Sequence, residues 1–186
     1  MTAASPDWPL ETERLLIRPF EAGDLEAMQA IHGDPRVVQW LYNEPRTPDE
    51  VREHLERKIA GSSLAAEGDW LSAAATLRDG GALVADLAMH LLNDEHRCVE
   101  VGYIIDPAYA GQGFATEATS ALVRLAFEQF GMHRVIGRVE PRNTGSVRVL
   151  EKLGMRREAH FVENEWVKGE WQSELVYAIL DREWAH

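Results

Sequence analysis

Apolar and polar positions repeat along this chain with two different periods, and each change of period marks a change of element. Short runs rich in β-branched and aromatic residues predict strands at 14–19, 70–77, 83–92, 99–105, 135–140, 161–168 and 171–180. Apolar residues three and four positions apart predict helices between positions 24 and 33, 47 and 61, 114 and 131, and 143 and 154. Because no linker or repeat divides the pattern, we expect one α/β domain over residues 1–186.

The clearest boundaries come from turn and capping residues. Thr47 to Glu50 reads as a capping box with proline at the first helical position. The sequence Asp-Gly-Gly at 79–81 predicts a hairpin turn, and Gly169 predicts a second one near the carboxyl end. The segment 34–46 is expected to be a loop, yet it carries several large apolar side chains. We interpret it as a wall of the substrate site, with a packed flap as the alternative.

The stretch 99–121 carries the main functional signal. A buried strand over 99–105 ends at Asp106 and Pro107, a small-residue turn follows at 110–113, and a helix begins immediately afterwards. A strand, a glycine turn and a helix N-terminus direct several backbone amides at one point, which suits a phosphate or pyrophosphate. The turn alone also fits a purely structural connection. A P-loop is excluded, because Phe114 and Ala115 stand where that motif has lysine and Ser/Thr.

Three segments together resemble the GNAT N-acetyltransferases, most closely the branch that contains the Rim-type ribosomal-protein acetyltransferases. The run 109–118, Tyr-Ala-Gly-Gln-Gly-Phe-Ala-Thr-Glu-Ala, is similar to the acetyl-CoA-binding motif of that family. The stretch 143–155 resembles the next motif, and 10–19 resembles the first strand. The resemblance implies a GNAT fold: a mixed, mostly antiparallel central sheet flanked by helices, with a central crossover from strand through glycine turn to helix.

The resemblance also implies where acetyl-CoA binds. The backbones of Ile104 and Ile105 would pair with its pantetheine arm. Its pyrophosphate would lie on the amides of the glycine turn, made of Gly111, Gln112, Gly113, Phe114, Ala115 and Thr116. Asn143 is expected to be a cofactor ligand, a helix N-cap, or both. The activity implied is transfer of an acetyl group from acetyl-CoA to a primary amine of a protein N-terminus or a small molecule, through a ternary complex.

Direct acyl transfer needs a neutral amine, a stabilised carbonyl oxygen and a protonated or otherwise stabilised leaving thiolate. We expect backbone amides of 103–105 to stabilise the oxygen. Glu100 is the candidate base, because it is the one acid within 99–105 and shares a strand face with Gly102. A charge at a solvated strand end is the alternative. Ser146 is the candidate proton donor to the sulfur, by resemblance to the Rim branch, with helix capping as its structural alternative.

Composition narrows the class of partner. A formal net charge of −12 argues against non-specific nucleic-acid binding, whereas 134–157 is locally basic, with seven Lys/Arg against two acids. That contrast suits an anionic cofactor beside a cationic acceptor, and a solvated helix face is the alternative. A single cysteine and the absence of a long apolar run predict a cytoplasmic protein with no membrane partner. The oligomeric state is open, a homodimer included.

Potential metal ligands and the alternatives to catalysis remain to be considered in this sequence. His90, His96 and Cys98 lie close together in sequence, but no helical histidine pair or cysteine-rich cluster accompanies them, so we expect no metal. A catalytic role also has rivals. A domain that binds acyl-CoA as a sensor, or an interaction domain that presents its basic helix to an acidic partner, would share the same motifs.

Overall fold

The computed structural model describes residues 5–61 and 63–184. One open sheet runs through it in the order β1-β2-β3-β4-β5-β6-β8-β7. All neighbouring strands are antiparallel except β5 and β6, which are parallel. The predicted class, a mixed and mostly antiparallel sheet with one central crossover, is confirmed. The strands are β1 (Leu10–Glu11), β2 (Leu15–Arg18), β3 (Trp70–Leu77), β4 (Leu83–Asn93), β5 (Cys98–Ile105), β6 (Arg134–Val139), β7 (Arg156–Val167) and β8 (Glu170–Leu180).

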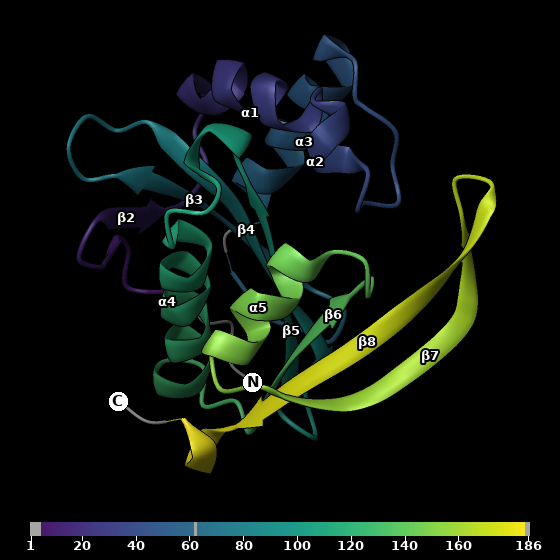
Figure 1. Cartoon of the computed structure of the whole chain (residues 1–186). Coiled ribbons are helices and arrows are strands. Elements are labelled where there is room, and N and C mark those ends of the chain that lie inside the picture. Colours follow the sequence, from purple (N-terminus) through teal and green to yellow (C-terminus); the bar gives the residue numbers. More distant parts are fainter. Residues whose placement is uncertain (1–4, 62, 185–186) are drawn as a thin grey trace.

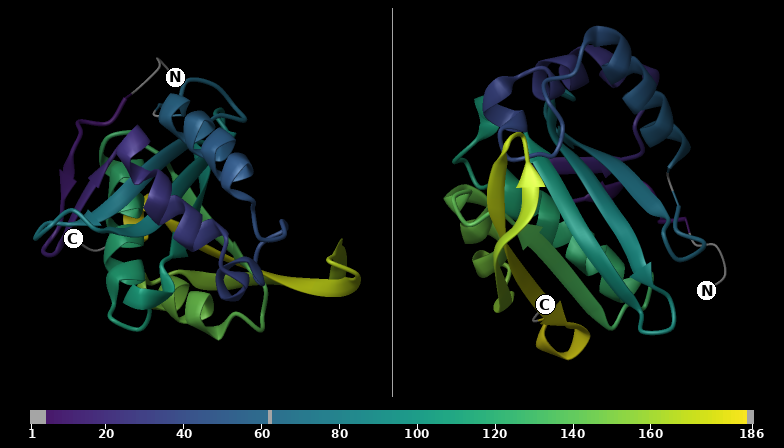
Figure 2. Two further views of the ribbon diagram at one scale, coloured as in Figure 1. Left: turned by 90° about the horizontal axis from the view of Figure 1, so that it is seen from above. Right: turned by 90° about the vertical axis from the view of Figure 1, so that its right-hand side faces the viewer.

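Helices cover both faces of the sheet (Figures 1 and 2). One face carries α1 (Leu25–His32), α2 (Pro35–Val38) and α3 (Pro48–Ala60), and the other carries α4 (Phe114–Glu128) and α5 (Thr144–Lys152). The larger apolar core contains Leu87, Val101 and Leu122 and lies against α4, whereas a smaller one with Met28, Ile31 and Leu55 lies under α1 and α3. No helix in the described part of the chain is both long and apolar enough to cross a bilayer.

The predicted caps and turns are found where the sequence places them. The Thr47 side chain accepts a hydrogen bond from the Glu50 amide, and the Glu50 carboxylate accepts one from the Thr47 amide. Gly113 caps α4 with φ +86°, a left-handed conformation that favours glycine. The segment 34–46 is not wholly a loop, because Asp34 caps the short helix α2 by accepting from the Arg36 amide.

The carboxyl-terminal hairpin is longer than predicted. Strand β7 begins at Arg156, five residues before the expected start, and the hairpin extends from the body as an arm (Figure 1). Its apolar pattern is weak because most of β7 is exposed, so residues 156–160 carry no hydrophobic alternation that would predict a strand. A register shift between Phe161 and Glu165, with φ +49° at Glu163, bends the strand.

Candidate active site

The parallel strands β5 and β6 pair only at their beginnings. The register joins Cys98, Val99 and Glu100 to residues 134–136 of β6. Strand β5 nevertheless continues to Ile105, and β6 to Val139. Alternate backbone groups of a strand point to alternate neighbours, so those of 101–105 that point toward β6 have no partner in the ladder. This V-shaped gap is an opening into the centre of the sheet.

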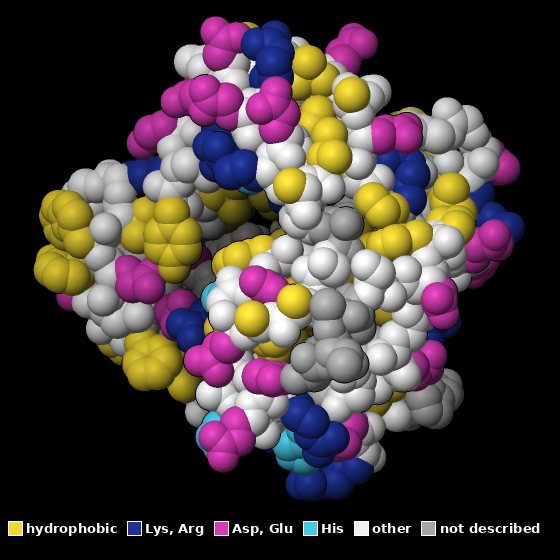
Figure 3. All heavy atoms as spheres, turned by 180° about the vertical axis from the view of Figure 1, so that it is seen from behind, with side chains coloured by type: hydrophobic (Ala, Val, Ile, Leu, Met, Phe, Trp, Pro, Cys, Tyr) yellow, Lys and Arg dark blue, Asp and Glu magenta, His cyan; other side chains and the backbone are white. Residues whose placement is uncertain are grey.

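A cavity of about 450 Å³ lies at this gap. Its walls include Gly102, Tyr103 and Ile104 of β5, and Gly137 and Arg138 of β6. Side chains of α1, α3, the 40–46 segment and the β7–β8 hairpin close it on the other sides. The face shown in Figure 3 is hollowed between the hairpin side and the helices, with hydrophobic and acidic side chains around the hollow.

Glu100 lies on the wall of this cavity, on the face it shares with Gly102 and Ile104. Its side chain is 24% exposed, and an oxygen lies 3.5 Å from the Arg138 guanidinium. Burial raises the pKa of the Glu100 carboxyl; Arg138 opposes that rise and Glu174 adds to it. A carboxylate in these surroundings holds a proton more readily than an exposed one, as a general base requires.

The rim beside Glu100 is mainly acidic. Glu174 is buried, burial raises the pKa of its carboxyl, and it shares Arg138 with Glu100 at 3.5 Å. Glu165 of β7 accepts from the Tyr42 hydroxyl at 2.6 Å, which ties the hairpin to the 40–46 segment. Residues 40–43 and 46 of the segment line the cavity; that the segment borders the substrate stays a prediction.

Ser146 and Asn143 come from the start of α5. The Asn143 carboxamide oxygen accepts from the Ser146 amide at 3.1 Å, so Asn143 is the N-cap of the helix. The Ser146 hydroxyl lies 2.7 Å from the hydroxyl of Tyr103, and burial raises the pKa of Tyr103 to about 12. The sequence does not predict this contact, because Tyr103 and Ser146 are 43 residues apart along the chain. Only the strand register brings position 103 to α5.

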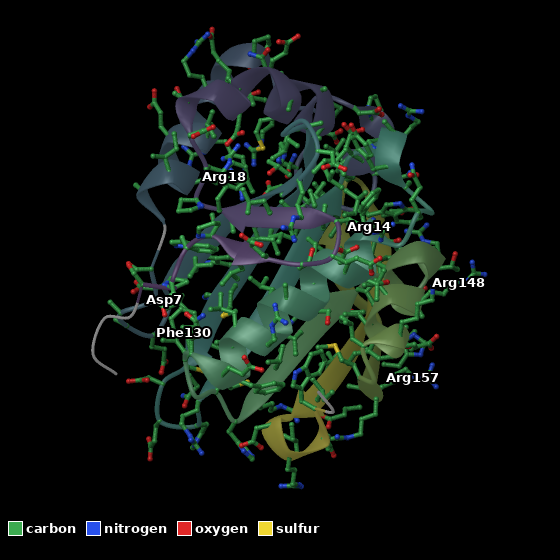
Figure 4. The ribbon with its side chains drawn as sticks, turned by 90° about the vertical axis from the view of Figure 1, so that its left-hand side faces the viewer. Asp7, Arg14, Arg18, Phe130, Arg148 and Arg157 are labelled. Carbon is green, nitrogen blue, oxygen red and sulfur yellow. The ribbon has the colours of Figure 1, made fainter. Side chains whose placement is uncertain are left out.

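The glycine turn does not line the cavity but lies beyond the end of β5, after a 3₁₀ turn at Pro107–Tyr109. Gly111 has φ +76°, and no atom lies within 4 Å of the place a Cβ would take. Arg14, a residue that the sequence analysis did not single out, holds the turn in place. Its guanidinium donates to the Gln112 carbonyl and to Glu117, and it stacks over the Phe114 ring at 4.1 Å (Figure 4).

Of the predicted site residues, the structure brings Glu100, Ile104, Asn143 and Ser146 together around the cavity. Ile105 ends β5 next to them, and the six residues of the glycine turn lie further along, exposed apart from Phe114, Ala115 and Thr116.

The basic segment 134–157 does not form a single free patch. Four of its seven cations are in ion pairs: Arg134 with Glu158, Arg138 with Glu100 and Glu174, Arg142 with Glu140 and Glu170, and Arg156 with Glu158 and Glu183. Arg148 and Arg157 point outward instead (Figure 4). The local excess of positive charge read from the sequence is therefore reduced both by acids two residues away, Glu140 and Glu158, and by acids that are distant along the chain.

At the inner end of the cavity lies a buried polar cluster that the sequence analysis missed. Asp86 of β4 accepts from Lys58 at 2.7 Å and lies 2.8 Å from the His32 ring. Burial acts to raise the pKa of Asp86, yet the charge of Lys58 and the bond to His32 hold it below its ordinary value. Burial lowers the pKa of His54 to about 3, helped by neighbouring cations, so His54 is neutral at physiological pH.

The prediction that no metal is bound was made for His90, His96 and Cys98. In the described chain, three potential ligand side chains instead come within 4.8 Å of one another at His32, His54 and Asp86. Lys58 already supplies a positive charge to Asp86 there, so a metal ion would have to displace an ammonium group. The structure therefore gives no support for a metal at this cluster.

Comparison with known proteins identifies the family of this chain. The family described as "Acetyltransferase (GNAT) domain" matches residues 14–156. The uncharacterized N-acetyltransferase YnaD of Bacillus subtilis is 31% identical over 175 residues, which is 94% of this chain and 98% of that protein. A crystal structure of a GNAT-family acetyltransferase from Bacillus anthracis superposes with a TM-score of 0.85 at 32% identity, covering 94% of this chain and 99% of the other.

Two further relatives have more specific names. YdaF of Bacillus subtilis, a candidate ribosomal N-acetyltransferase, is 28% identical and covers 92% of this chain and 94% of its own length. The spermidine N(1)-acetyltransferase of Vibrio cholerae is 25% identical, and the alignment covers 90% of this chain and 93% of that protein. The acceptors in these names differ in kind, one a ribosomal protein and the other a polyamine.

Proposed function

This chain belongs to the GNAT acetyltransferase family and is an acetyl-CoA-dependent N-acetyltransferase, and we propose that the gap between β5 and β6 is where it transfers the acetyl group. The observation that carries this proposal is the end of the β5–β6 pairing at Glu100. An extended amide-bearing chain such as pantetheine forms hydrogen bonds with an open strand edge as another strand would. The exposed edge of 101–105, including Ile104 and Ile105, suits it.

The glycine turn would hold the pyrophosphate. Gly113 caps α4 without a side chain, so the first amides of the helix remain available to an anion. Positive φ at Gly111 and Gly113 gives a concave backbone, and the open space at Gly111 lets a ligand approach it. Gln112, Phe114, Ala115 and Thr116 of the turn would contribute their backbone amides to the same anion site. Asn143 acts first as the α5 cap, and its position on the cavity wall suits a second role as a cofactor ligand.

The reaction forms a C–N bond between the amine and the thioester carbonyl carbon and breaks the C–S bond. Glu100 accepts the proton that the amine loses, directly or through water. Backbone amides of 103–105 stabilise the carbonyl oxygen as negative charge develops on it. Ser146, in contact with Tyr103 at 2.7 Å, donates a hydrogen bond or a proton to the sulfur that leaves. Each group is supplied by β5, which borders the gap, or by α5, the helix that follows β6.

Charge at the rim supports a cationic amine acceptor. Glu100, Glu165 and Glu174 face the cavity, and Arg138 offsets one of these charges. An ammonium ion is attracted to such a rim before it loses its proton. Protein N-termini and small amines both satisfy this requirement. For the oligomeric state, the proposal includes a homodimer. Relatives named as N-acetyltransferases support turnover rather than a sensing or interaction role.

An amine panel tests the proposed function. The protein is incubated with acetyl-CoA and peptide, polyamine and amino-amide acceptors, and products are identified by mass spectrometry while released CoA thiol is titrated. We expect one acetyl group on an amine nitrogen for each CoA released. Tight CoA binding without acetylation of any amine would replace the enzyme proposal by the sensor reading, whereas failure to bind CoA would favour an interaction domain.

A further inference from the structure

Two buried polar atoms at the inner end of the cavity have no hydrogen-bond partner within the described residues: His32 Nδ1 and Arg46 Nε. Both residues line the cavity. They are neighbours, since the Arg46 amide donates to the His32 carbonyl at 3.0 Å. Buried donors and acceptors in proteins are almost always paired. A cavity that leaves one donor and one acceptor unpaired is therefore complementary to a ligand group that carries both an acceptor and a donor.

The contacts of His32 determine what its free nitrogen can do. His32 is 2% exposed, and its Nε2 lies 2.8 Å from Asp86. Asp86 also accepts from the Lys58 ammonium, so the carboxylate is ionised and Nε2 carries the proton. Nδ1 then offers a lone pair, whereas Arg46 Nε offers an N–H.

The strand register places this pair beside the acyl-binding segment. Asp86 lies directly opposite Ile104, one residue from Tyr103. His32 and Arg46 line the same cavity as Tyr103 and Ile104, so an acceptor whose amine meets the 103–105 amides lies in one cavity with both side chains. Among simple groups, an amide provides the required carbonyl acceptor and N–H donor together.

We propose that His32 and Arg46 recognise an amide group of the acceptor, with the amide carbonyl accepting from Arg46 Nε and the amide N–H donating to His32 Nδ1. This inference rests on the proposed function and narrows its acceptor to an α-amino amide. A carboxylate would satisfy Arg46 but present no donor to His32. An ester offers the carbonyl alone, and a plain alkylamine offers neither group.

Four small acceptors separate these cases in the wild-type enzyme: alaninamide, alanine methyl ester, alanine and 2-butanamine. The amide and the ester form the matched pair, because their amines have similar basicity and they differ in the N–H donor. We expect kcat/KM for the amide to exceed that for the ester by about tenfold, mainly through KM, as for one neutral hydrogen bond. Alaninamide and an N-terminal alanyl peptide then distinguish a small amide from a peptide source.

Two variants assign the contacts. His32→Gln keeps an N–H for Asp86 but removes the lone pair of Nδ1, so the preference for amide over ester should disappear. Arg46→Lys keeps the charge but removes Nε–H, so both carbonyl compounds should lose affinity. Arg52→Lys is the control, because Arg52 lies on the outer side of α3 and is paired with Asp49. This variant should change neither the preference for amide over ester nor the affinity for the two carbonyl compounds.

The wild-type comparison does not depend on how the variants fold. Equal kcat/KM for amide and ester, a preference for alanine or 2-butanamine, or acetylation only of amines outside this set would overturn the inference and leave the proposed function intact. Acetylation of no amine at all would overturn the proposed function itself.

Discussion

The hydroxyl of Tyr103 on β5 lies 2.7 Å from the hydroxyl of Ser146 on α5. This contact joins the two sides of the gap, and the Tyr103 hydroxyl also lies 3.1 Å from the Ser146 carbonyl oxygen. When Tyr103 donates its proton to the Ser146 hydroxyl oxygen, the Ser146 proton is free to point to another acceptor. The pair therefore offers a donor at the gap although neither side chain alone is a strong acid.

The first prediction concerns this pair. Ser146→Ala and Tyr103→Phe should each lower kcat by about tenfold or less, because a thiolate is a good leaving group and needs only modest stabilisation. The double variant should be no slower than the slower single variant, since groups that act as a unit are not additive. Single-turnover acetylation rates measure the chemical step. A double variant whose fold-loss in rate equalled the product of the two single losses would show that the two hydroxyls act independently.

The contact also shows where sequence analysis succeeds and where it stops. Thr47 and Asn143 were identified as caps, and the glycine turn at 110–113 as the start of a helix, because these signals depend on residues within one turn. Glu100 was found because a strand period of two assigns it to a face. Tyr103 was not paired with Ser146, because their contact depends on how far β5 and β6 remain together, which no local pattern encodes.

The inner cluster was missed for the same reason. His32, Lys58 and Asp86 belong to α1, α3 and β4, and each reads alone as a surface or strand residue. The arginines of 134–157 show the opposite error: their local charge was visible, but their glutamate partners at 158, 170, 174 and 183 lie elsewhere along the chain. Long-range pairing, unlike capping, has no signature within a short window.

The second prediction concerns the proton acceptor. Glu100→Gln should lower kcat/KM by about 10²–10⁴-fold near neutral pH, the usual cost of losing a general base. In the wild type, activity should fall on the acid side with a midpoint above that of an ordinary glutamate, because burial raises the pKa of Glu100. The variant should lose this acid limb, and its deficit should shrink as pH approaches the pKa of the acceptor amine, about 10 for an alkylamine and about 8 for an α-amino group.

Glu174→Gln is the matched control for Glu100. It removes a buried acid from the same cavity and the same partner, Arg138. We expect a higher KM for cationic acceptors with the acid limb retained. A Glu100→Gln enzyme whose pH–rate profile matched the wild type would remove Glu100 from the mechanism, and catalysis would then rest on positioning and the strand amides.

The third prediction separates charge from backbone strain at the glycine turn. Gly111 has φ +76° with open space at its Cβ position, and asparagine and aspartate are the side chains that best tolerate a left-handed conformation. Gly111→Asn and Gly111→Asp should therefore fold equally well. Only the aspartate adds negative charge where the phosphates approach, so it should weaken CoA binding much more in calorimetric titration. Equal affinity of the two variants would place the pyrophosphate away from this turn.

The last prediction concerns the stability of the inner cluster. Asp86→Asn leaves the buried Lys58 ammonium without its anion, which typically costs about 3–5 kcal/mol of unfolding free energy. Combining it with Lys58→Met removes both charges and should recover much of that loss. Because the folded-state pKa of Asp86 is below its ordinary value, the carboxylate stabilises the fold above the unfolded pKa of about 3.9 and loses this effect as pH falls. Urea unfolding at pH 7 and at pH 4 or below should therefore show a wild-type advantage over Asp86→Asn that shrinks in acid. An advantage that stayed constant over this range would mean that the ionised form of Asp86 is not what holds α1 and α3 to β4.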